Sequence, residues 1–190
     1  MPPNHGDFHF RLAIDADIPA ISALIDASVR GLGPQAYSPS QIEQALGTWL
    51  GLDTQLILDE TYFVVEAVPA PSSAGPPTLV GCGGWSRRKT PYGSDARPGR
   101  DDALLDPRND AAKIRAFFVH PAFARRGIGS HILELCEQAA RDEGFSHAEM
   151  GATLTGVPLY RHHGYAEAGR VDLPLANGEV LPIVKMTKHL

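Results

Sequence analysis

The segment FFVHPAFARRGIGS, residues 117–130, decides the fold of this chain. Its apolar start predicts a strand, and its glycines predict a tight turn that opens a helix. Such a junction directs several free backbone N–H groups and the positive end of the helix at one point, where phosphate groups bind. Glycine at 127 and 129 lets a ligand approach the backbone, and Arg125 and Arg126 add positive charge.

Two common phosphate-binding motifs do not match this segment. A P-loop needs Lys and then Ser or Thr after its last glycine, but Ile128 and Ser130 flank Gly129. A dinucleotide-binding GxGxxG motif needs a third glycine where this chain has Ile132, and it normally opens the first βαβ unit. The segment by itself is equally compatible with a glycine-tightened helix start that carries two solvated arginines.

Outward from this segment, hydrophobic periodicity predicts alternating strands and helices. The predicted strands are residues 8–14, 61–68, a strand that begins at 78, and 113–120, 147–152, 171–175 and 180–186. The predicted helices are a long one after Asp15 or Asp17, a shorter one that begins at Ser38 or Ser40 and reaches Trp49, one from Gly127 to Gly144, and a brief one at 157–162.

The segments between these elements predict two hairpins and one long loop. The turn-rich residues 69–77 separate two strands that are expected to pair, and Asn177-Gly178 predicts the turn of a closing hairpin. Residues 89–110 have no periodicity, so we expect a long surface loop that borders a site.

The order of motifs in the second half of the chain resembles the GCN5-related N-acetyltransferase (GNAT) family. A strand, Val-x-Pro, a basic turn, Gly-Ile-Gly and a long helix precede a further strand and then LYRHHGY at 159–165. The resemblance implies one α/β domain over residues 1–190, with a mixed, mostly antiparallel sheet whose central strands splay and which helices flank. The chain departs from the family's usual pattern at Ala124, where Gln or Arg is usual, and at residues 153–156, where an asparagine is common.

The resemblance also implies acetyl-CoA as co-substrate and assigns roles to residues. The expected cofactor-binding residues are Phe117, Phe118, Val119, Arg125, Arg126, Gly127, Ile128, Gly129 and Ser130. Tyr160 is expected to protonate the departing thiolate, a role that suits a phenol because its pKa of about 10 keeps it protonated at neutral pH. The alternative for Tyr160 is an aromatic ring that only packs in the core.

An amine acceptor must lose a proton before it attacks, so a base is expected as well. Glu149 resembles, after a shift of one residue, the strand glutamate that some family members use; a solvated strand carboxylate is the alternative. His120, His162 and His163 are further candidates because imidazole titrates near neutrality. The acceptor pocket is expected to contain Tyr37, Trp85, Tyr92 and Arg115, although Trp85 is equally compatible with an ordinary sheet aromatic.

Composition and charge restrict the remaining classes of function. The 190 residues include 17 Lys and Arg against 22 Asp and Glu, a formal net charge of −5, which disfavours a nucleic-acid surface and favours a cationic substrate. Cys82 and Cys136 form no CxxC pair and lie among apolar residues, so both are expected to be buried and reduced. There is no HExxH pattern, which predicts no metal site.

The start of the sequence lacks the pattern of a signal peptide and no apolar run is long enough for a bilayer, so the cytoplasm is the expected location, without a membrane partner. The leading hypothesis is direct transfer of an acetyl group to a primary amine of a small molecule or peptide. A non-catalytic acyl-CoA-binding regulator is the alternative from another class, and transfer of a longer acyl group is a second enzymatic one. The assembly is left open, with a homodimer as one candidate.

Overall fold

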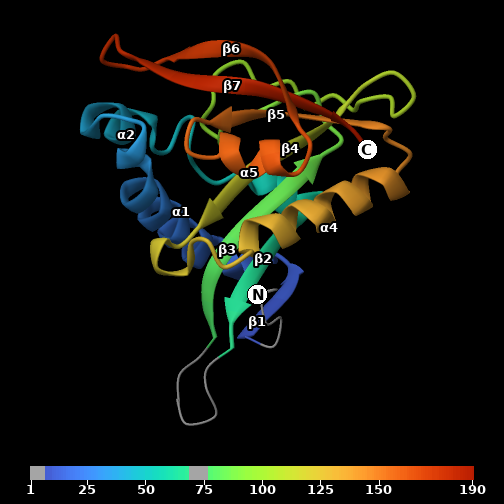
Figure 1. Ribbon diagram of the computed structural model, residues 1–190, viewed down its shortest axis with the longest axis horizontal. Helices are drawn as coiled ribbons and strands as arrows, with labels where there is room; N and C mark the ends of the chain where they lie inside the picture. The colour runs from blue at the N-terminus through green and yellow to red at the C-terminus, as the bar shows by residue number, and fades with distance from the viewer. Residues whose placement is uncertain (1–6, 69–76) are drawn as a thin grey trace.

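The computed structural model describes residues 7–68 and 77–190, so the predicted loop at 69–77 lies almost entirely outside the described residues. Its sheet has the strand order β1-β2-β3-β4-β5-β7-β6 (Figure 1). The strands are β1 (Phe8–Leu12), β2 (Tyr62–Ala67), β3 (Thr78–Ser86), β4 (Ala112–Val119), β5 (His147–Thr153), β6 (Ala166–Pro174) and β7 (Val180–His189). The α-helices are α1 (Ile18–Leu32), α2 (Pro39–Ala45), α3 (Thr54–Leu58), α4 (Ile128–Asp142) and α5 (Val157–His162), and short 3-10 turns are η2 (Asp15–Asp17), η3 (Gly33–Gln35) and η4 (Pro121–Phe123).

The two central strands, β4 and β5, form the single parallel pair in the described sheet, and every other pairing is antiparallel. Their pairing covers only Ala112 with Ala148 and Lys113 with Glu149. Beyond that point β4 contains Ala116 at φ 55°, a left-handed conformation that bends the strand. The central strands therefore splay, as the family resemblance implies.

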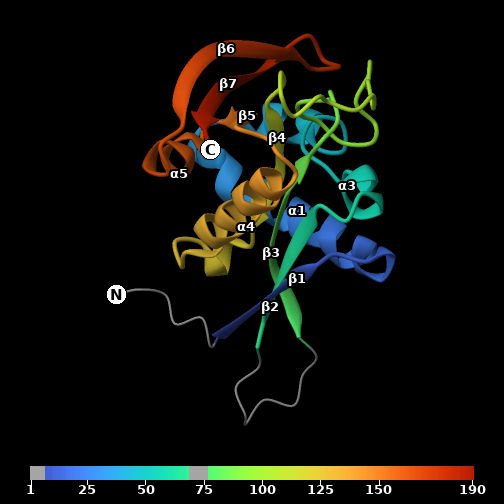
Figure 2. The same cartoon turned by 90° about the vertical axis from the view of Figure 1, so that its right-hand side faces the viewer.

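Helices cover both faces of the sheet, because neighbouring residues of each strand point to opposite sides. In β2, Val65 packs in the cluster that contains Ile132 of α4, and Val64 packs in the cluster that contains Ile21 of α1. Figure 2 shows α1 and α4 flanking the long strands. Glycines in β3 allow the close approach of α4: a Cβ at Gly81 would lie 2.5 Å from Cγ2 of Ile128.

Local signals that the sequence shows clearly are confirmed at the ends of the elements. Ser38 caps α2 by accepting a hydrogen bond from the Gln41 N–H at 3.1 Å. The Asn177-Gly178 turn joins β6 and β7, with Gly178 at φ 84°. The residues from Gly127 open α4 as predicted, and Gly127 itself has φ 82°.

Other expectations were wrong in their bounds. The second helix ends at Ala45 rather than reaching Trp49, whose indole N–H donates to the Pro174 carbonyl at 2.9 Å. The five-residue α3 has no counterpart in the sequence analysis, because one and a half turns are too short for a periodic pattern. β6 begins at Ala166 rather than at 171. Its first five residues are all exposed, so they show no alternation of apolar and polar residues in the sequence. The loop at 89–110 is partly internal, since Thr90 and Ser94 are buried.

Within residues 7–68 and 77–190, no helix combines the length and the apolar character that a membrane crossing requires.

Candidate active site

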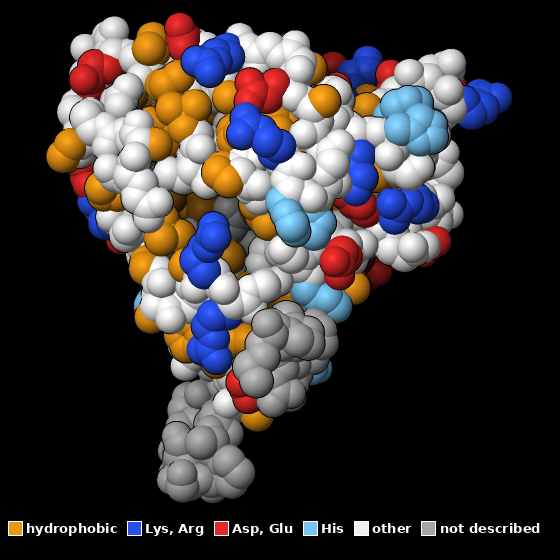
Figure 3. Space-filling model, in the orientation of Figure 1, with side chains coloured by type: hydrophobic (Ala, Val, Ile, Leu, Met, Phe, Trp, Pro, Cys, Tyr) orange, Lys and Arg blue, Asp and Glu red, His pale blue; other side chains and the backbone are white. Residues whose placement is uncertain are grey.

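A cavity opens where β4 and β5 diverge, and side chains from both strands and from α5 line it. Figure 3 shows this face of the molecule hollowed, with basic side chains near the hollow. The lining residues are Trp49, Leu50, Gly51, Tyr92, Gly93, Ile114, Arg115, Ala116, Phe117, Phe118, Met150, Gly151, Ala152, Thr153 and Tyr160. The splay thus creates a site in the middle of the sheet, where an evenly paired sheet would have none.

The turn before α4 presents a row of unpaired peptide N–H groups. Arg125 (φ 64°) and Gly127 (φ 82°) both adopt the left-handed conformation, and regular helical bonding begins with the His131 N–H, which donates to the Gly127 carbonyl at 3.1 Å. Within the described part of the chain, the peptide N–H groups of residues 125–130 donate to no protein acceptor. Such a concave row of N–H groups at a helix start fits a pyrophosphate.

The side chains of this turn take different positions. Arg125 and Arg126 are exposed, and the Arg126 guanidinium lies over the rings of Phe8 (5.0 Å) and Phe123 (5.4 Å). Ile128 is buried in the core, so only its backbone faces the turn. A Cβ at Gly129 would meet Cδ2 of Leu159 at 3.1 Å, which means that this glycine keeps α4 close to α5.

Of the three residues 117–119 at the end of β4, two line the cavity and one does not. Phe117 and Phe118 line the cavity, but Val119 does not. The Val119 N–H donates instead to Oγ of Ser28 at 3.2 Å. Main-chain contacts to a ligand that runs along β4 are therefore expected nearer to Phe117.

Tyr160 reaches the cavity from α5. It is 7% exposed, and its ring lies edge-on to Phe117 and to Tyr165, each with ring centroids 6.0 Å apart. Burial raises the pKa of this phenol well above its ordinary value, so the O–H stays protonated at neutral pH and can act as a proton donor. A hydrogen bond of 2.9 Å between Nε2 of His163 and Oγ of Ser130 ties α5 to the first turn of α4.

The candidate bases all lie outside the residues that line the cavity. Glu149 pairs with Nζ of Lys113 at 2.5 Å, where β4 and β5 are still in register. Nδ1 of His120 accepts from the Ala122 N–H at 3.2 Å and caps η4. His162 is exposed, and its ring lies edge-on to that of His163 at 5.4 Å.

The expected acceptor residues separate into two pairs. Tyr92 and Arg115 line the cavity. Trp85 does not: it is 2% exposed and packs edge-on against Phe145 in the core, which is the alternative role considered for it. Tyr37 is also placed elsewhere, because its hydroxyl donates to the Pro182 carbonyl (2.9 Å) and accepts from the Leu154 N–H (2.8 Å). Neither Trp85 nor Tyr37 lines this cavity, because buried packing and hydrogen bonds hold them elsewhere.

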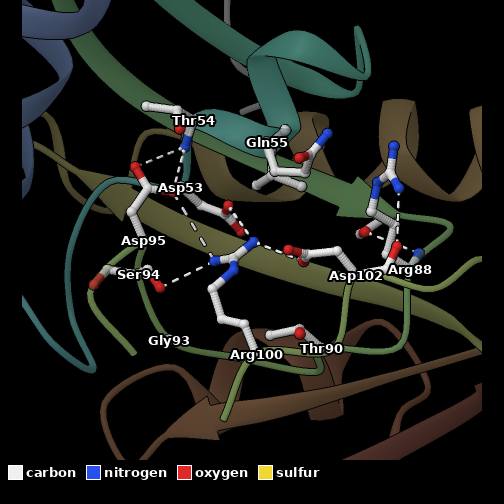
Figure 4. A network of polar contacts seen from close by, with 12 residues as sticks. Asp53, Thr54, Gln55, Arg88, Thr90, Gly93, Ser94, Asp95, Arg100 and Asp102 are labelled. Carbon is white, nitrogen blue, oxygen red and sulfur yellow. Dashed lines mark hydrogen bonds and ion pairs between the residues drawn. The ribbon is translucent and has the colours of Figure 1, made fainter. Parts of the chain in front are cut away.

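A buried ion-pair network at the edge of the cavity was not predicted. Asp53, which is 0% exposed, lies 2.7 Å from the Arg115 guanidinium and 3.1 Å from that of Arg100. Figure 4 shows Arg100 reaching Asp53, Asp102 and the backbone of Ser94. Burial raises the pKa of Asp53 despite these two cations. Asp53 follows Leu52 in a stretch without periodicity, so no sequence signal marked it.

Comparison with known proteins places the chain in a family. Residues 59–167, more than half of the chain, match the family described as an acetyltransferase (GNAT) domain. The chain belongs to the GNAT family. The matched range includes the N–H row, both splayed strands and Tyr160, and it covers every residue that lines the cavity except Trp49, Leu50 and Gly51.

Several solved structures share the GNAT fold along almost the whole chain. A GCN5-related N-acetyltransferase from Rhodopseudomonas palustris is 21% identical with a TM-score of 0.65, and the match covers 100% of this chain and 97% of that one. The PaiA N-acetyltransferase from Thermoplasma acidophilum, in complex with coenzyme A, is 14% identical with a TM-score of 0.60 and coverage of 96% and 99%. A Mycobacterium tuberculosis protein in complex with CoA is 19% identical with a TM-score of 0.57 and coverage of 96% and 99%. A search of curated proteins gave no match.

Proposed function

We propose that this GNAT protein transfers the acetyl group of acetyl-CoA directly to a primary amine. The observation that carries the proposal is the position of Tyr160, a buried and protonated phenol in the cavity between the splayed strands. The His163–Ser130 hydrogen bond connects its helix to the unpaired N–H groups before α4. A proton donor and a pyrophosphate site are therefore held in one framework.

The residues present fit acetyl-CoA, which supplies an activated thioester to the site. The peptide N–H groups of residues 125–130 would hold its pyrophosphate, and the exposed arginines at 125 and 126 add positive charge. Tyr160 would donate its proton to the departing sulfur, whose thiol has an ordinary pKa of about 8.5. A pure binding module has no need of such a donor, which is why we favour an enzyme over a regulator.

The amine must enter the reaction in its neutral form, although an alkylammonium has a pKa of about 10. No Asp, Glu or His lies among the residues that line the cavity. The guanidinium of Arg115 does lie there, and a nearby positive charge disfavours the ammonium form of the acceptor. Glu149, which precedes Met150 of the lining, is our candidate for passing the released proton to solvent.

The test of this function is the release of free CoA from acetyl-CoA in the presence of a panel of amines, with acetylated product identified by mass spectrometry. We expect release that depends on the amine and is fastest with acetyl-CoA among acyl chain lengths. CoA binding without release for any amine would instead identify a regulator.

Three further statements belong to this proposal. The protein acts in the cytoplasm, its partner is an amine-bearing substrate and neither a nucleic acid nor a membrane, and a homodimer is a candidate assembly. The net charge of −5 supports the exclusion of nucleic acid.

Direct transfer predicts that neither cysteine takes part in turnover. Both thiols are buried, and burial raises the pKa of Cys82 to about 12, so a reactive thiolate does not form at neutral pH. We expect a Cys82→Ala, Cys136→Ala double variant to keep kcat within about 2-fold, because no acyl-enzyme forms. Loss of turnover in a double variant that still folds and binds CoA would show a covalent route.

Gly127→Val should weaken CoA binding. At φ 82° a β-branched residue is strained, and its side chain would crowd the N–H row. We expect an affinity loss of about 10-fold or more by calorimetry, since several charge-assisted hydrogen bonds depend on this turn. Gly178→Val, at φ 84° in the β6–β7 turn, carries a similar backbone strain as a control and should leave the affinity unchanged. Equal affinity in folded Gly127→Val would exclude the N–H row as the binding site.

A further inference from the structure

The charge of the cavity differs from the charge of the whole protein. Arg115 is the single charged residue among those that line it, and it is only 4% exposed. The rest of the lining is aromatic, aliphatic, glycine or hydroxyl-bearing. The expectation of a cationic substrate came from the net charge of −5 of the whole sequence, which does not describe this site.

The buried carboxylate beside Arg115 is shared with another cation. Asp53 pairs with Arg115 at 2.7 Å. It also pairs with Arg100 at 3.1 Å (Figure 4). The other carboxylates around Arg100, those of Asp95 and Asp102, are partly exposed, so water screens them. One fully buried negative charge therefore faces two positive charges, and the Arg115 Nε has no hydrogen-bond partner within the described residues.

A third guanidinium lies over two aromatic residues of the lining. That of Arg97 is centred 5.0 Å from the ring of Tyr92 and 5.9 Å from the ring of Trp49. Unlike that of Arg100, the guanidinium of Arg97 has no carboxylate partner and no hydrogen bond in the described part of the chain, and its Nε is buried without an acceptor. A guanidinium held in place by aromatic rings, with its donors unused, is prepared to bind an oxyanion.

We propose, on the basis of the function above, that the amine acceptor carries an anionic group, a carboxylate or a phosphate, which Arg97 binds beside Tyr92 and Trp49. A planar guanidinium donates two parallel hydrogen bonds to either oxyanion. Arg115 adds positive potential from within the cavity and keeps polycationic acceptors out. The acceptor class is therefore an amino acid or an aminoalkyl phosphate, and polyamines and lysine-rich peptides are disfavoured.

The experiment compares matched amines in the acetyl-CoA assay. The carboxylate arm pairs L-phenylalanine, L-tryptophan and L-methionine with the amines that lack the carboxyl group, and β-alanine with propylamine. The phosphate arm pairs O-phosphoethanolamine with ethanolamine. We expect kcat/KM to be about 10- to 100-fold higher for the anionic member of at least one pair, the range for a hydrogen bond to a charged group.

Variants of Arg97 test the residue itself. Arg97→Gln should remove the preference by raising KM for the anionic amine while kcat at saturation stays near its original value, and Arg97→Lys should restore part of it. Arg108→Gln, an exposed arginine of the same loop that pairs with Asp106, is the matched control and should change nothing. Equal kcat/KM across every pair, or an undiminished preference in Arg97→Gln, would overturn the proposal.

A binding measurement separates this proposal from the proposed function. Calorimetry of the same amines is carried out on the CoA-saturated protein, with and without Arg97→Gln. If no amine is acetylated, the proposed transferase function fails. The anionic site then still stands if an anionic member binds more tightly than its neutral partner and Arg97→Gln removes the difference. It fails if no member of any pair binds more tightly.

Discussion

Tyr160→Phe should lower kcat by about 10²- to 10⁴-fold, the usual contribution of a positioned general acid. The substitution removes only the hydroxyl. The ring that packs against Phe117 and Tyr165 stays, so the affinity for CoA and the thermal stability should change little. Because the lost interaction belongs to the transition state, kcat and kcat/KM should fall together. Initial rates of CoA release with any accepted amine, together with calorimetry of CoA binding, measure both quantities.

Tyr165→Phe provides the matched control. Tyr165 is also buried and its ring lies edge-on to that of Tyr160, but it does not line the cavity, so we expect the kcat of this variant to stay within a few-fold of the original value. If Tyr160→Phe also leaves kcat unaltered, Tyr160 is a core aromatic. If it weakens CoA binding at intact turnover, Tyr160 is a cofactor contact and another group protonates the sulfur.

The parts of the fold that the sequence predicted are those with strong local signals. The Gly127 turn, the Ser38 cap, the Asn177-Gly178 turn and the periodic face of α4 each depend on a few neighbouring residues. The splay of β4 and β5 has no such local sign. It depends on the left-handed backbone at Ala116, a residue that ordinarily prefers other conformations, so only the family resemblance implied it.

The site shows the same division. The N–H row and Tyr160 lie in the contiguous motifs at 117–130 and 159–165. Tyr160 lines the cavity, and the His163–Ser130 hydrogen bond ties the end of its helix to the first turn after the N–H row. Trp49 of the cavity lining, and Arg97 and Asp53 beside the cavity, come from segments far apart in the chain, so no local motif marked them. The sequence leaves two roles open for Trp85 because a strand residue faces the core or the cavity according to its position in the alternation, and the bulge between Cys82 and Gly84 shifts the register just before it.

Asp53→Asn should lower the free energy of unfolding by about 3–5 kcal/mol, the cost of leaving a buried charge without its partner. The exchange preserves the size of the side chain, so the loss reports on charge and not on a cavity. Asp53 is fully buried against the Arg115 guanidinium at 2.7 Å, and water cannot replace the missing carboxylate there. Urea unfolding followed by circular dichroism measures the change. Asp95→Asn is the matched control, because its carboxylate is 44% exposed and should contribute no more than about 1 kcal/mol.

A double-mutant cycle with Arg115→Met then distinguishes a charge effect from general damage to the loop. If the pair is the unit of stability, Arg115→Met alone should also destabilise, and the double variant should lose clearly less than the sum of the two single losses. Asp53 also pairs with Arg100 at 3.1 Å, so the double variant still leaves Arg100 without this partner. We therefore expect the second substitution to recover only part of the stability. Strictly additive losses would mean that Asp53 and Arg115 act independently. In that case the fold would tolerate the buried charge of Arg115 without Asp53, and other residues would have to stabilise that charge.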